Sequence, residues 1–234
     1  MALPKPLRPE YTTTIPSTGK RIKYQPFTVK EEKVLVLAAE GGDPDEITNA
    51  VSNVLSNCIT TAGVEVDELA LFDVEYLFLK CRAKSVGEKI ELQVQDPNDP
   101  DFVTEHSVDV DKIKIEKSKN HNPLIDLGDN MMIKMKYPDI HFFSSGINLQ
   151  GINNQFDIIA KCVSQIVSGE EVYQATDMGA GEIEEWLESL TSSQFTKILE
   201  FFATMPKLSH SITKKNTNTG ENFTIVLEGL ADFF

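Results

Sequence analysis

The spacing of apolar residues changes near residue 88, and this change constrains the fold more than any other feature of the chain. Before it, apolar residues recur at helical spacing for three turns between Ile47 and Ile59. After it, Ile90, Leu92 and Val94 alternate with polar residues, which is the period of a strand. A chain with both periods in separate stretches is expected to fold as an α+β protein.

Signals for helix ends recur before this change of period. Thr28 and Glu31 match a capping box, and a pair of glycines ends the expected helix at Gly42. Asp43, followed at once by proline, is a favoured N-cap for a second helix. A third helix is expected over residues 68–84. This part of the chain is therefore predicted to be helical.

Strands are expected first beyond residue 88, and helices return later. Residues 131–137 alternate as residues 89–95 do, which indicates a small antiparallel β unit. Helical spacing resumes from Asn153. The stripe that predicts one continuous helix there consists of Phe156, Ile159, Ala160, Val163, Ile166 and Val167.

Two shorter helices and a hairpin are predicted for the last quarter of the chain. An acidic helix over residues 182–190 carries Trp186, and Thr191 begins a second capping box. Strands are expected over residues 208–214 and 222–228, on either side of a stretch rich in turn-forming residues.

The first 27 residues differ from the rest because they hold five prolines. Proline fixes φ and removes a backbone donor, so this segment is predicted to be an extended arm rather than a helix. Its apolar residues Leu7, Tyr11 and Phe27 can pack along the body of the same chain or reach a neighbouring molecule. Both interpretations remain open.

The predicted fold class is therefore α+β, with a mainly helical body, an inserted small antiparallel β unit and a C-terminal β-hairpin. At 234 residues, the chain is long enough for one large domain or two small ones. The predicted segments are a proline-rich extended arm (1–27), an N-terminal helical part (28–87), the inserted β unit (88–138) and a C-terminal helical part with the terminal hairpin (139–234).

The net charge of −14 narrows the range of partners. Proteins that bind nucleic acid or anionic membranes gain affinity from clustered Lys and Arg, so neither partner is expected here. No run of about 18 apolar residues occurs, and no membrane-spanning helix is expected. The three cysteines lie far apart among aliphatic residues, which is typical of core thiols in a reducing cytoplasm.

No recognisable catalytic or cofactor-binding motif is present in the sequence. Histidines and cysteines are too scattered for a zinc site, and there is no phosphate-binding glycine loop. Glutamates do cluster around Trp186, between residues 182 and 188. A catalytic carboxylate pair needs an apolar setting for one member, whereas these glutamates fit the exposed face of a helix. We expect no catalysis, metal or cofactor; the alternative is an acidic hydrolase that uses these carboxylates.

Aromatic residues gather in the last third of the chain. Phe201 and Phe202 are adjacent and cannot share one helical face, so at least one is exposed or covered by another element. Exposed aromatic side chains mark interaction surfaces, but Phe233 and Phe234 can equally fold back over this helix. The candidate interaction residues are Leu7, Tyr11, Phe27, Trp186, Phe201, Phe202, Phe233 and Phe234.

Several segments in order along the chain resemble one protein family. They are Leu3-Pro4, Tyr11, Ile15-Pro16-Ser17, Pro26–Lys33, Asp73–Ser85, Met135–Pro138, Phe201–Leu208 and Glu228–Phe234. Together they resemble the T-even-type baseplate proteins of contractile-tailed bacteriophages, and the resemblance spans nearly the whole chain. No single segment is a mechanistic signature, so the resemblance rests on their succession.

The resemblance implies a role in assembling the central hub of the phage tail baseplate, as a hub subunit or as an assembly chaperone. It implies binding to other tail proteins, namely hub, spike or tape-measure components, and it implies neither a cofactor nor an active site. The expected location is the host cytoplasm during assembly and then, for a subunit, the baseplate of the virion. A homo-oligomer and an adaptor protein unrelated to phages remain as alternatives.

Overall fold

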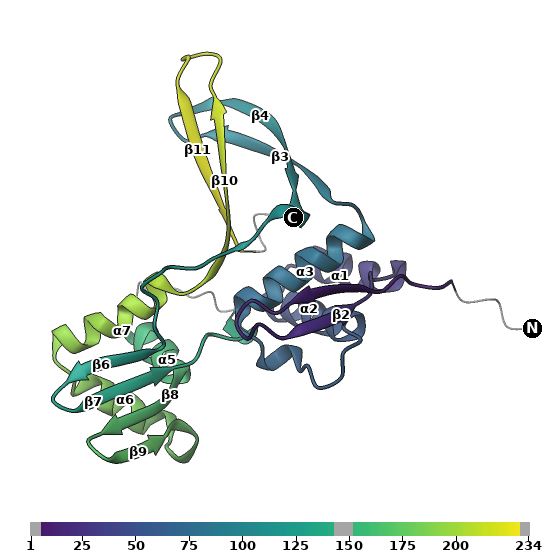
Figure 1. The fold of residues 1–234 in the computed structure, drawn as a ribbon. Helices are drawn as coiled ribbons and strands as arrows, with labels where there is room; N and C mark the ends of the chain where they lie inside the picture. The colour runs from purple at the N-terminus through teal and green to yellow at the C-terminus, as the bar shows by residue number, and fades with distance from the viewer. Residues whose placement is uncertain (1–5, 143–151, 230–234) are drawn as a thin grey trace, which may run out of the picture. The chain divides into compact units, whose positions relative to one another are not determined.

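The computed structural model describes residues 6–142 and 152–229, whose contacts divide the chain into two compact units (Figure 1). Unit 1 joins residues 1–116 to residues 207–234, and unit 2 consists of residues 117–206. Unit 2 is therefore an insertion within unit 1. These boundaries differ from those of the segments drawn from sequence character.

Unit 1 begins with a short antiparallel hairpin followed by three helices. These elements are β1 (Tyr11–Thr14), β2 (Arg21–Tyr24), α1 (Val29–Gly41), α2 (Pro44–Cys58), the single 3₁₀ turn η1 (Val66–Glu68) and α3 (Leu71–Ser85). The hairpin turn is fastened to α3 by Asp73, whose buried carboxylate accepts hydrogen bonds from the Ser17 backbone N–H (2.8 Å) and the Ser17 hydroxyl. Much of the proline-rich segment is thus held against its own unit.

The predicted helix ends are confirmed for α1 and α2. Gly42 adopts a left-handed conformation (φ 70°) and its N–H donates to the Ala38 carbonyl, which ends α1. Asp43 then caps α2, because its carboxylate accepts the backbone N–H of Asp45 at 2.9 Å. The two helices therefore meet at a tight connection between Gly42 and Pro44 and pack against each other.

The rest of unit 1 consists of two antiparallel hairpins (Figure 1). Their elements are β3 (Lys89–Asp96), β4 (Asp99–Asp109), the 3₁₀ turn η2 (Val110–Lys112), β5 (Ile115–Glu116), β10 (Lys207–Lys215) and β11 (Asn222–Glu228). β3 pairs with β4, while β5 adds to the edge of β10 to give the order β11-β10-β5. The strands predicted over 208–214 and 222–228 are confirmed.

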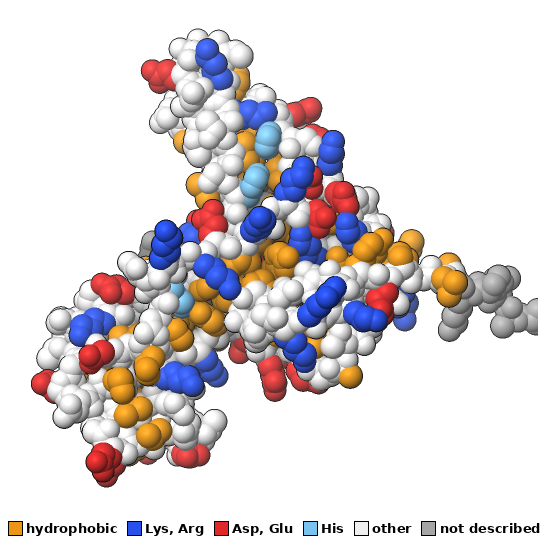
Figure 2. Space-filling view, viewed as in Figure 1, with side chains coloured by type: hydrophobic (Ala, Val, Ile, Leu, Met, Phe, Trp, Pro, Cys, Tyr) orange, Lys and Arg blue, Asp and Glu red, His pale blue; other side chains and the backbone are white. Residues whose placement is uncertain are grey.

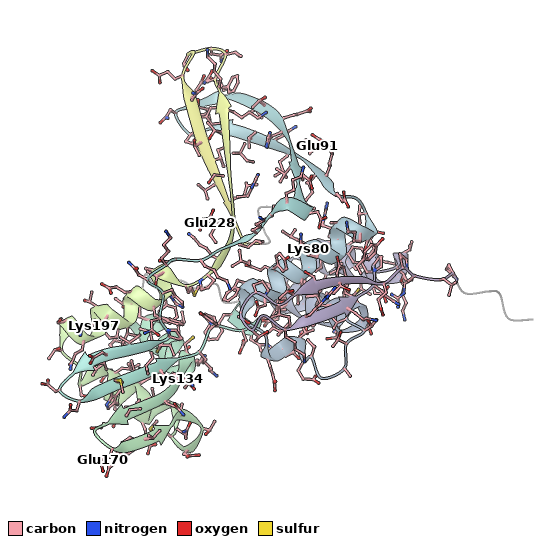
Figure 3. The ribbon with its side chains drawn as sticks, viewed as in Figure 1. Lys80, Glu91, Lys134, Glu170, Lys197 and Glu228 are labelled. Atoms are coloured by element: carbon pink, nitrogen blue, oxygen red, sulfur yellow. The ribbon has the colours of Figure 1, made fainter. Side chains whose placement is uncertain are left out.

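Unit 2 is a four-stranded antiparallel sheet with helices packed against it. Its elements are β6 (Leu124–Gly128), β7 (Met131–Met135), α5 (Ile152–Cys162), β8 (Val163–Ser168), β9 (Glu171–Gln174), the 3₁₀ turn η3 (Ala175–Asp177), α6 (Ala180–Glu188) and α7 (Ser192–Thr204). A single apolar core joins the sheet to α5, α6 and α7. Lys197 on α7 also donates to the Asp126 carbonyl on β6 at 2.8 Å (Figure 3).

The predicted mainly helical body with one small β unit is wrong. Helices hold 39% and strands 32% of the structure, and the described strands form four sheets, so the fold is mixed. The strands expected within residues 88–138 do not form one unit, because β3 and β4 belong to unit 1 and β6 and β7 to unit 2. Sequence periods identified individual strands but not their partners.

The continuous helix predicted beyond Asn153 is also wrong in its second half. Helix α5 ends at Cys162, and Val163 begins β8 without a break. The register between β7 and β8 shifts at Met135, which pairs with Val163 while Lys134 pairs with Gln165. This bulge lets Val163 and Ile166, three residues apart, both be buried. Two buried residues three positions apart are typical of a helix, but here the bulge produces that spacing in a strand.

Candidate protein interface on the first helix

Helix α1 begins with contacts that hold its first turn firmly. The Glu31 carboxylate accepts a hydrogen bond from the Thr28 backbone N–H (2.6 Å) and another from the Thr28 hydroxyl. Burial raises the pKa of Glu31, but these hydrogen bonds and the charge of Arg8 outweigh it and leave the pKa lowered. The start of α1 is thus fixed by its own side chains and by the segment that precedes it.

The rest of unit 1 covers few residues of α1, although this helix is rich in apolar side chains. Within Val29–Gly41, all of which the structure describes, Ala38 is the one buried residue. Val29 is 80% exposed, Val36 50% and Leu37 54%. With about 100° of rotation per residue, these three side chains lie within an arc of about 100° on the side away from Ala38.

We call this surface the outer face of α1 and define it as Val29, Lys30, Lys33, Val36 and Leu37. Both lysines are exposed; Lys33 lies within the same arc, between the apolar residues, and Lys30 lies at its edge beside Leu37. Glu40 is also exposed within this arc, so the surface combines apolar area with two positive charges and one negative charge. Contiguous exposed apolar side chains with a charged surround are typical of surfaces that other proteins cover.

Leu7 adds a further uncovered apolar side chain near the start of α1. It is 99% exposed, whereas its neighbour Arg8 donates from Nη1 to the Pro26 carbonyl oxygen at 3.2 Å. This contact ties the residue after Leu7 to the residues that lead into α1. Figure 2 shows hydrophobic side chains exposed among charged ones over unit 1.

Two of the predicted interaction residues in unit 1 pack inside it. Phe27 is buried and its ring lies 6.4 Å from that of Phe78, in a stacked arrangement. Tyr11 is half-buried, with its ring 5.8 Å from that of Tyr24. The structure therefore places these side chains against their own unit, unlike Leu7.

The predicted aromatic residues of unit 2 belong to its core. Phe201 and Phe202 are both buried, and their rings meet edge to face at 5.2 Å. Other elements cover both rings, so neither residue is exposed. Trp186 is half-buried and packs against the same core. Phe233 and Phe234 lie outside the described residues.

One histidine of unit 2, His121, has the surroundings that most resemble those of a catalytic residue. His121 Nδ1 lies 3.0 Å from the Thr204 hydroxyl and Nε2 lies 3.0 Å from the Tyr137 hydroxyl. Burial lowers the pKa of His121, and the rings of Tyr137 and Phe201 pack on its imidazole. Because both ring nitrogens have partners, this imidazole serves as a packed bridge between elements.

The glutamates near Trp186 do not form an enclosed carboxylate pair. Glu182 accepts the Gly179 backbone N–H at 3.0 Å and so caps α6. Glu184 is half-buried, while Glu185 and Glu188 are exposed. Neither arrangement provides the apolar setting that general acid catalysis by a carboxyl group requires.

The described residues offer neither a metal site nor a membrane-spanning helix. No group of three or more His, Cys, Asp or Glu side chains there has an arrangement that could hold a metal ion. No helix in the described part of the chain is both long and apolar enough to cross a membrane. The three cysteines are buried free thiols.

The outer face of α1 was not predicted from the sequence, although a signal for it exists. Apolar residues occur on every side of this helix, from Val29 through Ala39, instead of forming one stripe. A helix that is apolar all round is expected to be buried on all sides. One that lies at the surface of its own unit therefore leaves part of this apolar surface uncovered.

Comparison with known proteins gives one match. A family model described as “T4 bacteriophage base plate protein” matches residues 8–234 of the chain. No curated protein and no solved structure matches. The matched range includes α1, all three hairpins described in unit 1 and the whole of unit 2.

Proposed function

The chain belongs to the T4 bacteriophage base plate protein family, and on that premise we propose that it acts by binding other tail proteins through the outer face of α1. Leu7 lies at the margin of this interface. The protein is a structural component of the tail, and its work is to hold neighbours in place rather than to catalyse a reaction.

The observation that carries this proposal is the exposure of Val29, Val36 and Leu37 on a helix with firmly fixed ends. Exposed apolar side chains on a rigid element lose little conformational entropy when a partner covers them. In protein interfaces, a few side chains of this kind supply most of the binding free energy. Lys30 and Lys33 would favour a partner with acidic residues at the rim of its surface.

Within the baseplate, we assign the chain to the assembly of the central hub, with hub, spike or tape-measure proteins as its partners. It binds them in the host cytoplasm, as a subunit that remains in the tail or as a chaperone that leaves it. Counting the chain by quantitative mass spectrometry in purified particles separates these two roles. A fixed copy number relative to other tail proteins supports a subunit, and absence from particles together with abundance in the lysate supports a chaperone.

The interface is tested by introducing charge on the outer face of α1. A phage that lacks a working copy of this chain is supplied with the double variant Val36→Asp/Leu37→Asp during infection. We expect the yield of infective particles to fall at least about tenfold, since loss of a central apolar contact costs about 2 kcal/mol or more of binding free energy. Co-purification with other tail proteins should fall in parallel.

The matched control is Val103→Asp on β4, because Val103 is 50% exposed, as Val36 is. This variant should support a normal yield. Circular dichroism of both purified proteins checks that their helix and strand content is unchanged. Equal yields from the folded double variant and the control would contradict the proposed interface.

A further inference from the structure

The β3–β4 and β10–β11 hairpins of unit 1 face each other across an apolar space. Their buried or half-buried inward side chains are Ile90, Leu92 and Val94 on β3, Val108 on β4, Ile212 on β10, and Phe223, Ile225 and Leu227 on β11. β3 of one hairpin contacts β11 of the other. On β4 and β10, His106 and His210 are close enough for their charges to interact. The hairpins thus form a small two-layered β structure (Figure 1).

The tips of the hairpins are joined by a polar contact. Asn216 is fully buried, and its Nδ2 donates to Asp96 at 2.8 Å and to Asp99 at 3.0 Å. The ring of Phe102 meets that of Phe223 edge to face at 6.0 Å. These contacts fix the spacing of the two hairpins at their tips. Away from the tips, the edges of β3 and β11 border an open space.

A groove of about 680 Å³ follows β3 and borders on β11. Its walls include every residue from Ile90 to Gln95, together with Ile225 and Leu227. Successive side chains of a strand point to opposite faces, so a groove lined by six consecutive residues runs along the edge of the strand. Glu91 lies on β3 and Glu228 at the end of β11, on the hairpins that border this groove (Figure 3).

The strands that border the groove have backbone N–H and C=O groups that are not paired with another strand. Among the described strands, β3 pairs with β4 alone and β11 with β10 alone, so each has an edge without a neighbouring strand. An unpaired edge presents alternate N–H and C=O groups that can pair with an added strand. Residues 90–95 span about 17 Å, which matches an added strand of about six residues.

Arg82 supplies a charge at the groove. It lies on α3, lines the groove and is half-buried. Burial lowers its pKa, and among the described residues its guanidinium has no hydrogen-bond or ion-pair partner. A partly buried guanidinium without an acceptor is costly, and its planar donors match a carboxylate.

We propose that this groove binds an extended segment of a partner protein, which adds as a strand along the edge of β3 and places a carboxylate side chain against Arg82. Alternate apolar side chains of the added strand cover Leu92 and Ile225. Glu91 stays in solvent, since it points to the face opposite Ile90 and Leu92. This proposal rests on the proposed binding function but not on the outer face of α1.

The groove is tested with two synthetic peptides and the isotope-labelled full chain. One capped peptide alternates valine and threonine over five residues and carries aspartate at each end; the other carries asparagine at each end. We expect the aspartate peptide to shift the NMR signals of residues 90–95 and 225–227. It should bind at least about tenfold more tightly than the asparagine peptide, because a charge-assisted pair with Arg82 is made by only one of them.

The variant Arg82→Gln should remove this tenfold preference, whereas Arg21→Gln, at an exposed position on β2, should leave it unchanged. The comparison of two peptides on the unmodified chain does not depend on whether Arg82→Gln folds. Equal affinities, signal changes away from the groove, or no binding at millimolar peptide would overturn the proposal. Because particle yield tests α1 and peptide titration tests the groove, either one can fail without the other.

Discussion

Helices α1 and α2 follow each other in the chain, differ by two residues in length, and both start at well-formed caps. Helix α2 buries six of its residues, namely Thr48, Ala50, Val51, Val54, Leu55 and Cys58, whereas α1 buries Ala38. Both carry several apolar residues, so composition does not explain the difference. What differs is how those residues are distributed, in one stripe on α2 and around the whole circumference of α1.

This difference shows that the ends of a helix and its burial have separate causes. Side-chain hydrogen bonds within a few residues fix where a helix begins, whatever packs against it later. Burial depends on the other elements that reach the helix. An apolar side chain that its own unit leaves exposed on α1 is therefore available to another protein, while one on α2 supports the fold.

The largest expected loss of stability follows a substitution on the buried side of α2. Replacing Leu55, which is 0% exposed, by alanine should lower the free energy of unfolding by about 3 kcal/mol, because it leaves a cavity among packed side chains. Urea denaturation followed by far-ultraviolet circular dichroism measures this loss. A loss below about 1 kcal/mol would indicate that α2 is not the packed member of the pair.

A smaller loss of stability is expected for a substitution at the start of α2. Asp43→Ala should cost about 1 kcal/mol, since the Asp45 and Glu46 N–H groups would lose their acceptor. The control Asp43→Asn keeps a side-chain oxygen and should be nearly neutral. Amide exchange of the first turn of α2, measured by NMR, should accelerate in the alanine variant alone.

The first turn of α1 should respond to acid. The folded pKa of Glu31 is lowered, so its contribution to stability is present above the ordinary value of 4.5 and is lost as the pH falls through the folded pKa. Amide protection factors of residues 29–33 should therefore fall below about pH 4. Glu31→Gln keeps a capping oxygen without the charge, and it should remove this pH dependence.

The smallest effect on stability is expected on the outer face of α1. Val36→Ser and Leu37→Ser should each change the free energy of unfolding by no more than about 0.5 kcal/mol, because both side chains are already in solvent. The same urea titration as for Leu55→Ala gives the comparison. A loss of 2 kcal/mol or more would mean that this face supports the fold, as α2 does.

Local signals allowed much of the fold to be predicted. The caps at Glu31, Asp43 and Thr191 lie where expected, and the alternation in β3 and in the C-terminal hairpin is confirmed. The hairpin of β1 and β2 was missed because the prolines of the first 27 residues argued only against a helix. β9 was missed because all four of its residues are exposed and leave no alternating pattern.

The candidate interface was less predictable than the fold. Aromatic residues were selected because exposed aromatic side chains mark interaction surfaces. Their large apolar area also favours burial in the core, and Phe201 is buried beneath the His121 ring. The exposed apolar residues are aliphatic, and of these Leu7 alone was among the predicted interaction residues. Distinguishing Val36 from Val54 requires knowing which elements reach each helix, and that depends on contacts between residues distant in the chain.

Because unit 2 is inserted between β5 and β10, the order of synthesis bears on when the binding groove exists. The edge of β3 emerges from the ribosome early, but β10 and β11 lie beyond residues 117–206. At 5–20 residues per second, translating those 90 residues takes about 5–18 s. A nascent chain therefore passes through a period in which β3 lacks the opposing hairpin. A partner strand that needs both walls of the groove can bind only finished molecules, which would keep incomplete chains out of the growing tail.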